Sequence, residues 1–110
     1  MKKLLLIAAT IGIAASSNAQ RLSIYEEFSG ENCAPCAASN PALWTLLSGG
    51  TNPSKIILVK YQSPIPSAGP IYNAYKTVTD TRMTYYSVPF APYGRLNGTG
   101  LGSGTAAPTS

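Results

Sequence analysis

The stretch EEFSGENCAPCAASNPAL, residues 26–43, holds both cysteines of the chain, Cys33 and Cys36. The segment before them, residues 21–28, alternates apolar and polar side chains and predicts a strand. The segment after them, residues 35–48, repeats apolar side chains at helical spacing. The two cysteines therefore fall at a junction where a strand ends and a helix begins.

A second strand is expected after this helix. KIILVKYQ, residues 55–62, is a nearly continuous apolar run rich in branched side chains, which is typical of a strand buried on both faces of a parallel or mixed sheet. Strand, helix and strand in this order make a βαβ unit. Pro41 lies inside the helix and removes one amide donor, so we expect a kink there. The pattern predicts an α/β fold.

The second half of the chain predicts one more helix and a short strand. SPIPSAGP, residues 63–70, has the composition of a loop, and the apolar spacing over residues 71–86 favours a helix with a break near Asp80. YGRL, residues 93–96, followed by an Asn-Gly pair, is typical of a strand that enters a hairpin turn. The expected order is therefore a βαβ unit, a helix and a short strand or hairpin.

The last twelve residues, TGLGSGTAAPTS at 99–110, lack the branched apolar side chains expected of a returning strand. A two-layer domain is not expected to stop at a turn with one sheet edge unpaired. We therefore expect residues 20–98 to be the N-terminal and central part of an incomplete domain. Residues 99–110 are then a Gly/Ser/Thr-rich tail or the start of a truncated remainder.

The first nineteen residues differ from the rest. Two lysines precede LLLIAATIGIAA, residues 4–15, an apolar run without charge that is shorter than the roughly 20 residues needed to span a bilayer. Small residues follow at the positions that a signal peptidase reads, so we predict a signal peptide over residues 1–19. The protein is then exported, to the periplasm, the outer membrane or the outside of the cell. Membrane association is expected only through an uncleaved signal or a missing C-terminal part.

Composition excludes several classes of site. The chain has no histidine, so imidazole can serve neither as a base nor as a ligand. Without Lys2 and Lys3, six basic residues face four acidic ones, a net charge of about +2, and no cluster of basic residues marks a nucleic-acid surface. We expect no cofactor, no metal and no nucleic-acid partner.

The cysteine pair allows three interpretations. A separation of three residues in a helical turn brings Cys33 and Cys36 within disulfide reach. A cysteine at the start of a helix is stabilised as a thiolate by free amides and by the helix dipole, which favours redox chemistry. A structural disulfide closing a very small ring is the alternative. A zinc site would need two more ligands, and no further cysteine or any histidine is present.

The cysteine segment resembles the active-site unit of the thioredoxin superfamily. The shared features are a strand ending in an acidic residue and Phe, a Cys-x-Pro-Cys motif, and a helix with a proline five residues after the second Cys. The cysteine segment, together with KYQ, the loop ending in AGP and RMTYYSV…APYGRLNG, looks more narrowly like the Omp28-related exported proteins of the Bacteroidetes cell envelope.

The resemblance implies roles for particular residues. Cys33 and Cys36 would be the redox-active pair, and Glu27 would lie buried beneath them and relay protons. The superfamily also places a cis-proline opposite the cysteines, for which Pro92, after Ala91, is favoured over Pro89 because it directly precedes the short strand. Ala91 and Pro92 would then line a substrate groove.

Two departures concern the rim of this site. Asn32 stands where thioredoxins usually have Trp, and Ala37 stands where they have Lys, so the implied partner surface is less hydrophobic. The expected partners are protein thiols and disulfides of the envelope. The alternative is a non-catalytic envelope or surface binding module that keeps the disulfide for stability.

The remaining polar and aromatic side chains receive simpler interpretations. Glu26 and Glu31 are expected to be solvated charges near the strand end, and Arg82 and Arg95 are assigned no role. The later tyrosines are expected to pack in the core and its rim, at positions 72, 75, 85, 86 and 93.

Overall fold

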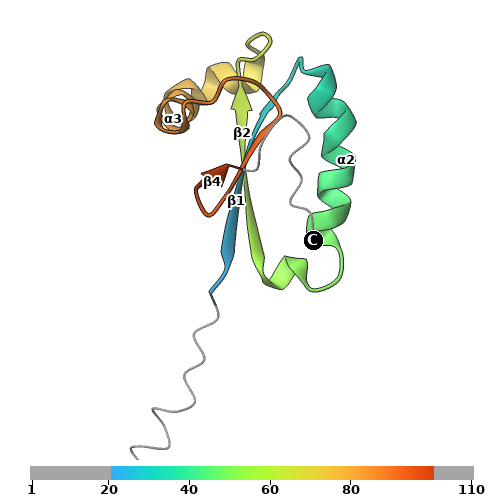
Figure 1. Ribbon diagram of the computed structural model, residues 1–110. Coiled ribbons are helices and arrows are strands. Elements are labelled where there is room, and N and C mark those ends of the chain that lie inside the picture. The colour runs from blue at the N-terminus through green and yellow to red at the C-terminus, as the bar shows by residue number, and fades with distance from the viewer. Residues whose placement is uncertain (1–20, 101–110) are drawn as a thin grey trace, which may run out of the picture.

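The computed structural model describes residues 21–100, which form a four-stranded mixed sheet and two helices (Figure 1). The strands are β1 (Ser23–Gly30), β2 (Ile56–Ser63), β3 (Tyr93–Leu96) and β4 (Thr99–Gly100), in the order β2-β1-β3-β4. β1 pairs in parallel with β2 and antiparallel with β3. The predicted α/β class, with a βαβ unit followed by a helix and a hairpin, is confirmed.

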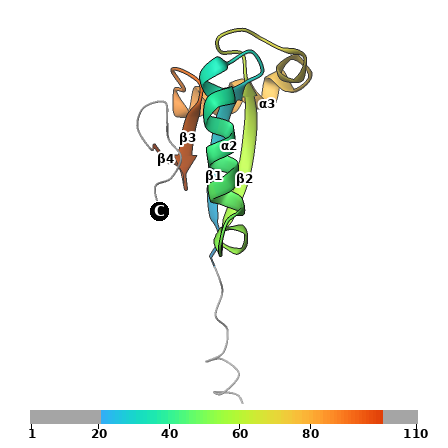
Figure 2. The same cartoon turned by 90° about the vertical axis from the view of Figure 1, so that its right-hand side faces the viewer.

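The two helices cover opposite faces of the sheet, as Figures 1 and 2 show from two sides. Helix α2 (Ala34–Ser48) packs Leu43 and Leu47 on Tyr25, and residues of β2 and β3 complete this core. Helix α3 (Pro70–Tyr86) packs on the other face. Because side chains alternate along a strand, β1 sends Tyr25 and Glu27 towards α2, and its neighbours Glu26 and Phe28 towards α3.

Helix α2 begins directly after Cys33 and contains Pro41 without ending there. A short 3₁₀ turn, η1 (Asn52–Ser54), leads from α2 into β2. The expectation that β2 is buried on both faces is wrong. β2 is the outer strand of the sheet, and Ile57 is 45% exposed because α3 crosses only part of its face. An apolar run in the sequence therefore does not distinguish an edge strand from a central strand.

The expected break of α3 near Asp80 is also wrong, because the helix departs from helical backbone angles at Tyr75 instead (φ −122°, ψ 21°). Asp80 supports the helix: its carboxylate accepts hydrogen bonds from Lys76 (2.6 Å) and from the hydroxyl of the buried Tyr72 (2.7 Å). Polar residues in the middle of the segment thus bridge successive turns rather than interrupt them.

The hairpin predicted at Asn97-Gly98 is present. Both residues have positive φ angles, 50° and 82°, as a two-residue hairpin turn requires. Thr99 and Gly100, assigned from the sequence to the tail, pair with β3 as the short strand β4. The predicted signal peptide and the remaining tail, residues 101–110, lie outside the described residues.

Candidate functional site

Cys33 and Cys36 form a disulfide at the start of α2, with their Cα atoms 5.2 Å apart. Cys33 occupies the N-cap position, and its Sγ accepts a hydrogen bond from the backbone N–H of Cys36 (3.2 Å). The Sγ of Cys36 accepts one from the backbone N–H of Gly30 (3.4 Å). Both sulfurs therefore lie against backbone donors, which is the environment that stabilises a thiolate after reduction.

The loop that follows β2 lies against the cysteine loop. A Cβ added at Gly30 would collide with the carbonyl oxygen of Ile65, so glycine is required for this close approach. The side-chain amide of Asn32 donates to the hydroxyl of Ser67 (3.1 Å). This loop forms one wall beside the disulfide and contains a cis peptide at Ile65-Pro66, which the sequence did not predict.

The loop before β3 forms the opposite wall. The Ala91-Pro92 peptide is cis, so the choice of Pro92 over Pro89 as the cis-proline is confirmed. The carbonyl oxygen of Ala91 lies 3.6 Å from Cys33 Sγ. In the disulfide this sulfur carries no proton, so the approach is a contact and becomes a hydrogen bond only with a reduced thiol.

Both cysteines are buried, Cys33 at 4% and Cys36 at 1% exposure. Cys33 is the more exposed of the two and is the one in contact with the Ala91-Pro92 loop.

Glu27 lies on the face of β1 that α2 covers and is 2% exposed. Lys60, its neighbour in register on β2, places Nζ 3.1 Å from Glu27 Oε2. The two atoms are close enough to form an ion pair. They are not aligned for a hydrogen bond, since Oε2 has no hydrogen-bond partner among the described residues. Burial and the charge of Glu27 raise the pKa of Tyr25, on the same face, to about 12. Sequence reasoning missed Lys60, whose place opposite Glu27 depends on the strand register.

The other face of β1 carries a second buried carboxylate, so the expectation that Glu26 is solvated is wrong. Glu26 is 4% exposed because α3 covers it. Arg82 donates to both of its oxygens, at 2.6 and 2.9 Å, and Tyr86 and Tyr61 donate their hydroxyls. These hydrogen bonds, that of Arg82 first, hold the pKa of Glu26 below its ordinary value of 4.5, although burial opposes them.

Arginines and tyrosines alternate between the end of α3 and β3. The Arg82 guanidinium lies 4.6 Å from the ring centre of Tyr86, and Arg95 lies 5.0 Å from the ring centres of both Tyr86 and Tyr93. Arg95 also donates to the backbone carbonyl of Tyr86 (3.1 Å) and to the Tyr93 hydroxyl (2.7 Å). Arg95 therefore joins α3 to the strand that follows Pro92, and Arg82 joins α3 to Glu26 of β1, although the sequence left both arginines without a role.

Glu31 is not a solvated charge either. Its two carboxylate oxygens accept hydrogen bonds from the backbone N–H groups of Ile71 (3.1 Å) and Tyr72 (3.0 Å). These amides lie in the first turn of α3, which has no acidic residue of its own and no side-chain cap. Glu31 thus caps α3 from the cysteine loop. Its negative charge also interacts favourably with the positive end of the helix dipole.

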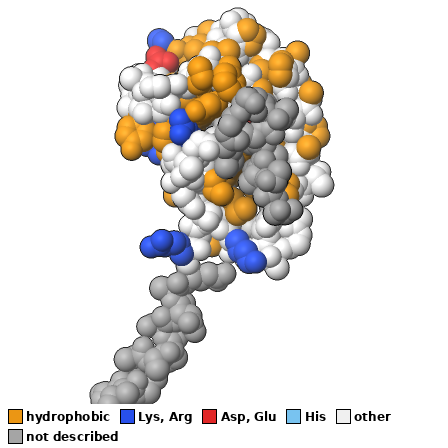
Figure 3. Space-filling model, in the orientation of Figure 1, with side chains coloured by type: hydrophobic (Ala, Val, Ile, Leu, Met, Phe, Trp, Pro, Cys, Tyr) orange, Lys and Arg blue, Asp and Glu red, His pale blue; other side chains and the backbone are white. Residues whose placement is uncertain are grey.

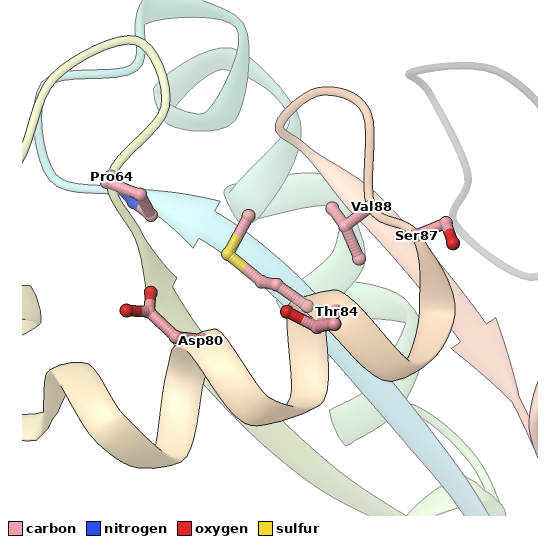
Figure 4. Close-up of a pocket in the computed structure, with 6 residues that line it drawn as sticks. Pro64, Asp80, Thr84, Ser87 and Val88 are labelled. Atoms are coloured by element: carbon pink, nitrogen blue, oxygen red, sulfur yellow. The ribbon is translucent and has the colours of Figure 1, made fainter.

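A pocket of about 550 Å³ lies between α3 and the two loops beside the disulfide (Figure 4). Pro64 from one loop and Val88 from the other lie on opposite sides of it, with Asp80 and Thr84 of α3 below them. Met83 of α3 also lines the pocket. The pocket adjoins the segment that leads to Pro92, and nothing in the sequence pattern predicted it.

No group of three or more potential metal-ligating side chains occurs within residues 21–100. None of the helices in that range is both long enough and apolar enough to cross a bilayer. Comparison with known proteins finds no matching family model, no matching curated protein and no matching solved structure.

Proposed function

We propose that the chain is an exported thiol–disulfide exchange domain that acts on proteins of the cell envelope or on secreted proteins. The observation that carries the proposal is the Cys33–Cys36 disulfide at the N-terminus of α2, in contact with the cis Ala91-Pro92 loop. The resemblance of the Cys-x-Pro-Cys segment to the thioredoxin superfamily supports the same function.

In the proposed reaction a partner thiolate attacks Cys33 Sγ. A partner–Cys33 disulfide forms as the Cys33–Cys36 bond breaks, and Cys36 leaves as a thiolate. A second thiolate of the partner then attacks the partner sulfur that is bonded to Cys33. The partner disulfide forms, and Cys33 is released as a thiolate. The partner dithiol is oxidised to a disulfide and this domain is reduced, with two electrons transferred; the reverse reaction starts from the Cys33 thiolate.

The surrounding residues have defined parts in this proposal. The backbone N–H of Cys36 stabilises the Cys33 thiolate, which lies at the positive end of α2. Ala91 and Pro92 line the groove along which the partner chain reaches Cys33. Glu27, buried on the face below α2 and paired with Lys60, takes up the proton of the Cys36 thiol when Cys36 attacks and returns it when Cys36 leaves.

The experiment is trapping of the mixed disulfide. The reduced Cys36→Ser variant, mixed with oxidised glutathione, is expected to retain glutathione on Cys33, because no second thiol can displace it. The Cys33→Ser variant is the matched control and should retain much less, because Cys36 is more deeply buried. Mass spectrometry under non-reducing conditions measures both adducts. Equal and slow labelling of the two variants would contradict the assignment of Cys33.

The burial of both sulfurs favours a second candidate, a non-catalytic envelope or surface binding module like the Omp28-related proteins, with a structural disulfide. In that case the disulfide of the folded protein resists reduction, and dithiothreitol reduces it only at the rate of unfolding. Reduction measured with and without about 2 M urea separates the two candidates, since only a structural disulfide is reduced many times faster as unfolding accelerates.

A further inference from the structure

The apolar side chains that remain exposed gather on one side of the sheet. Eight large hydrophobic residues within the described range are exposed, and six of them lie on the α3 side. Ile24 and Ile57, neighbours in register, lie on the part of the sheet that α3 leaves open. The other four lie on α3 itself: Ile71, Tyr75, Val78 and Tyr85. Figure 3 shows hydrophobic side chains over the region of α3.

The α3 residues form a seam, which we define as Ile71, Tyr75, Val78 and Tyr85. Val78 and Tyr85 are seven residues apart, the repeat with which one helix packs along another. Tyr75 lies at the point where α3 departs from helical angles, and Ile71 lies before it. They are exposed by 49%, 65%, 62% and 72%. A groove of about 390 Å³ runs between the first three and residues 60–62 of β2. The seam therefore lies beside the outer strand of the sheet.

The outer edge of β2 is open within the described part of the chain. β2 has eight residues, contains no proline, and pairs only with β1 among the described strands. Such an edge is a template for another strand unless charged side chains or a bulge block it. Lys60, the lysine inside β2, is turned towards Glu27 and paired with it. The one charge inside the edge strand is therefore already paired, although the Lys60 side chain stays 32% exposed.

The four carboxylates of the chain are all bound within it, on both sides of the sheet. Of the four acidic residues, Glu26 pairs with Arg82, Glu27 with Lys60 and Asp80 with Lys76, while Glu31 caps α3. A strongly charged partner would find no unpaired carboxylate to recognise. The seam itself contains no charged residue, so two seams in contact bring no like charges together.

We propose that β2 and the α3 seam form the interface of a homodimer. The β2 strands of two copies pair antiparallel about a two-fold axis, which joins the two sheets and brings the two seams together, as an isologous contact requires. At their exposed fractions the six apolar side chains present roughly 450 Å² per copy. Two copies then bury about 900 Å² plus the strand edges, close to the roughly 1,000 Å² of a weak specific interface.

Sedimentation velocity of the full chain between about 1 and about 100 µM tests the proposal, because an interface of this size is expected to dissociate in that range. The expected result is a reversible shift from monomer to dimer with rising concentration. Val78→Lys is expected to raise the dissociation constant at least about tenfold, because it buries an unpaired charge. Its far-ultraviolet circular dichroism should be unchanged, since Val78 is exposed.

Trp44→Lys is the matched control, because Trp44 is 66% exposed and lies on α2, on the opposite side of the sheet. It should dimerise like the parent chain. In hydrogen exchange, the β2 amides that point away from β1 should gain protection with rising concentration. A chain that stays monomeric throughout the range overturns the proposal. Association that Val78→Lys leaves unchanged also overturns it, which is the result expected if the copies associate through residues 1–20 instead. Association that Trp44→Lys weakens as much as Val78→Lys does overturns it as well.

Discussion

Replacing Glu26 by Gln tests the buried ion pair with Arg82 under α3. The side chain of Glu26 is 6% exposed, and its two hydrogen bonds from Arg82 measure 2.6 and 2.9 Å. A hydrogen bond to a charged group contributes about 1.5–3 kcal/mol, and glutamine keeps only one neutral acceptor. Glu26→Gln is therefore expected to lower the free energy of unfolding by about 2 kcal/mol at pH 7, and the melting temperature by about 8–16 °C.

The effect of Glu26→Gln should depend on pH. Because hydrogen bonds from Arg82 lower the pKa of Glu26 in the folded protein, the ionised carboxylate stabilises the fold above the ordinary value of 4.5. This contribution is lost as the pH falls below 4.5 and through the folded-state value. The difference between parent and variant should accordingly be full at pH 7 and shrink as the pH falls below about 4.5.

Urea unfolding followed by circular dichroism measures this difference at each pH. Asp80→Asn is the control, because the Lys76–Asp80 pair is also an ion pair but lies on the surface, with its side chains 59% and 41% exposed. It should leave the unfolding midpoint nearly unchanged. A Glu26→Gln effect no larger than that of Asp80→Asn, or one of the same size at pH 3 and pH 7, would refute the reasoning.

Three further predictions concern single contacts. In a spectrophotometric titration, Tyr25 should ionise near pH 12, and Tyr25→Phe should lower the absorbance change there by that of one tyrosine, while Tyr61 and Tyr86, whose pKa values are also raised, remain. The neutral Tyr25 stabilises the fold below its ordinary pKa of 10.0, and this contribution is lost between pH 10.0 and about 12. Glu31→Ala should lower the free energy of unfolding by about 0.5–2 kcal/mol, because it removes the cap of α3, and should speed hydrogen exchange at the amides of Ile71 and Tyr72. Unchanged exchange at these two amides would contradict the cap. Gly94→Ala should lower the free energy of unfolding, measured with urea, by more than about 1 kcal/mol, because the new methyl group would meet the Tyr25 hydroxyl. Adding Tyr25→Phe should restore part of this stability, and an unchanged free energy of unfolding in Gly94→Ala would disprove the contact.

Much of the fold could be predicted because local patterns determine it. The strand before Cys33, the helix after it and the Asn-Gly turn are each specified by residues adjacent in sequence. The disulfide and the cis bond before Pro92 follow from spacing and from the family resemblance, and both are present.

The errors concern what only tertiary packing decides. An apolar run looks the same in an edge strand and a central strand, so the exposure of Ile57 could not be predicted. Glu26 and Glu27 are adjacent, and the sequence gives no sign that α3 buries the first as deeply as α2 buries the second. The pairing of Glu26 with Arg82 joins positions 56 residues apart, and that of Glu27 with Lys60 depends on strand register. Neither could be found without the fold.

The reduction potential of the Cys33–Cys36 disulfide tests the proposed function most directly. The folded protein is equilibrated with glutathione or dithiothreitol buffers, and the reduced fraction is measured after acid quenching and thiol alkylation. An exchange domain with Cys33 at the start of α2 should have a potential between about −120 and −270 mV, and its reduced Cys33 should react as a thiolate below pH of about 8.5. A potential below about −300 mV, with Cys33 inaccessible to alkylation until the protein unfolds, would contradict the account.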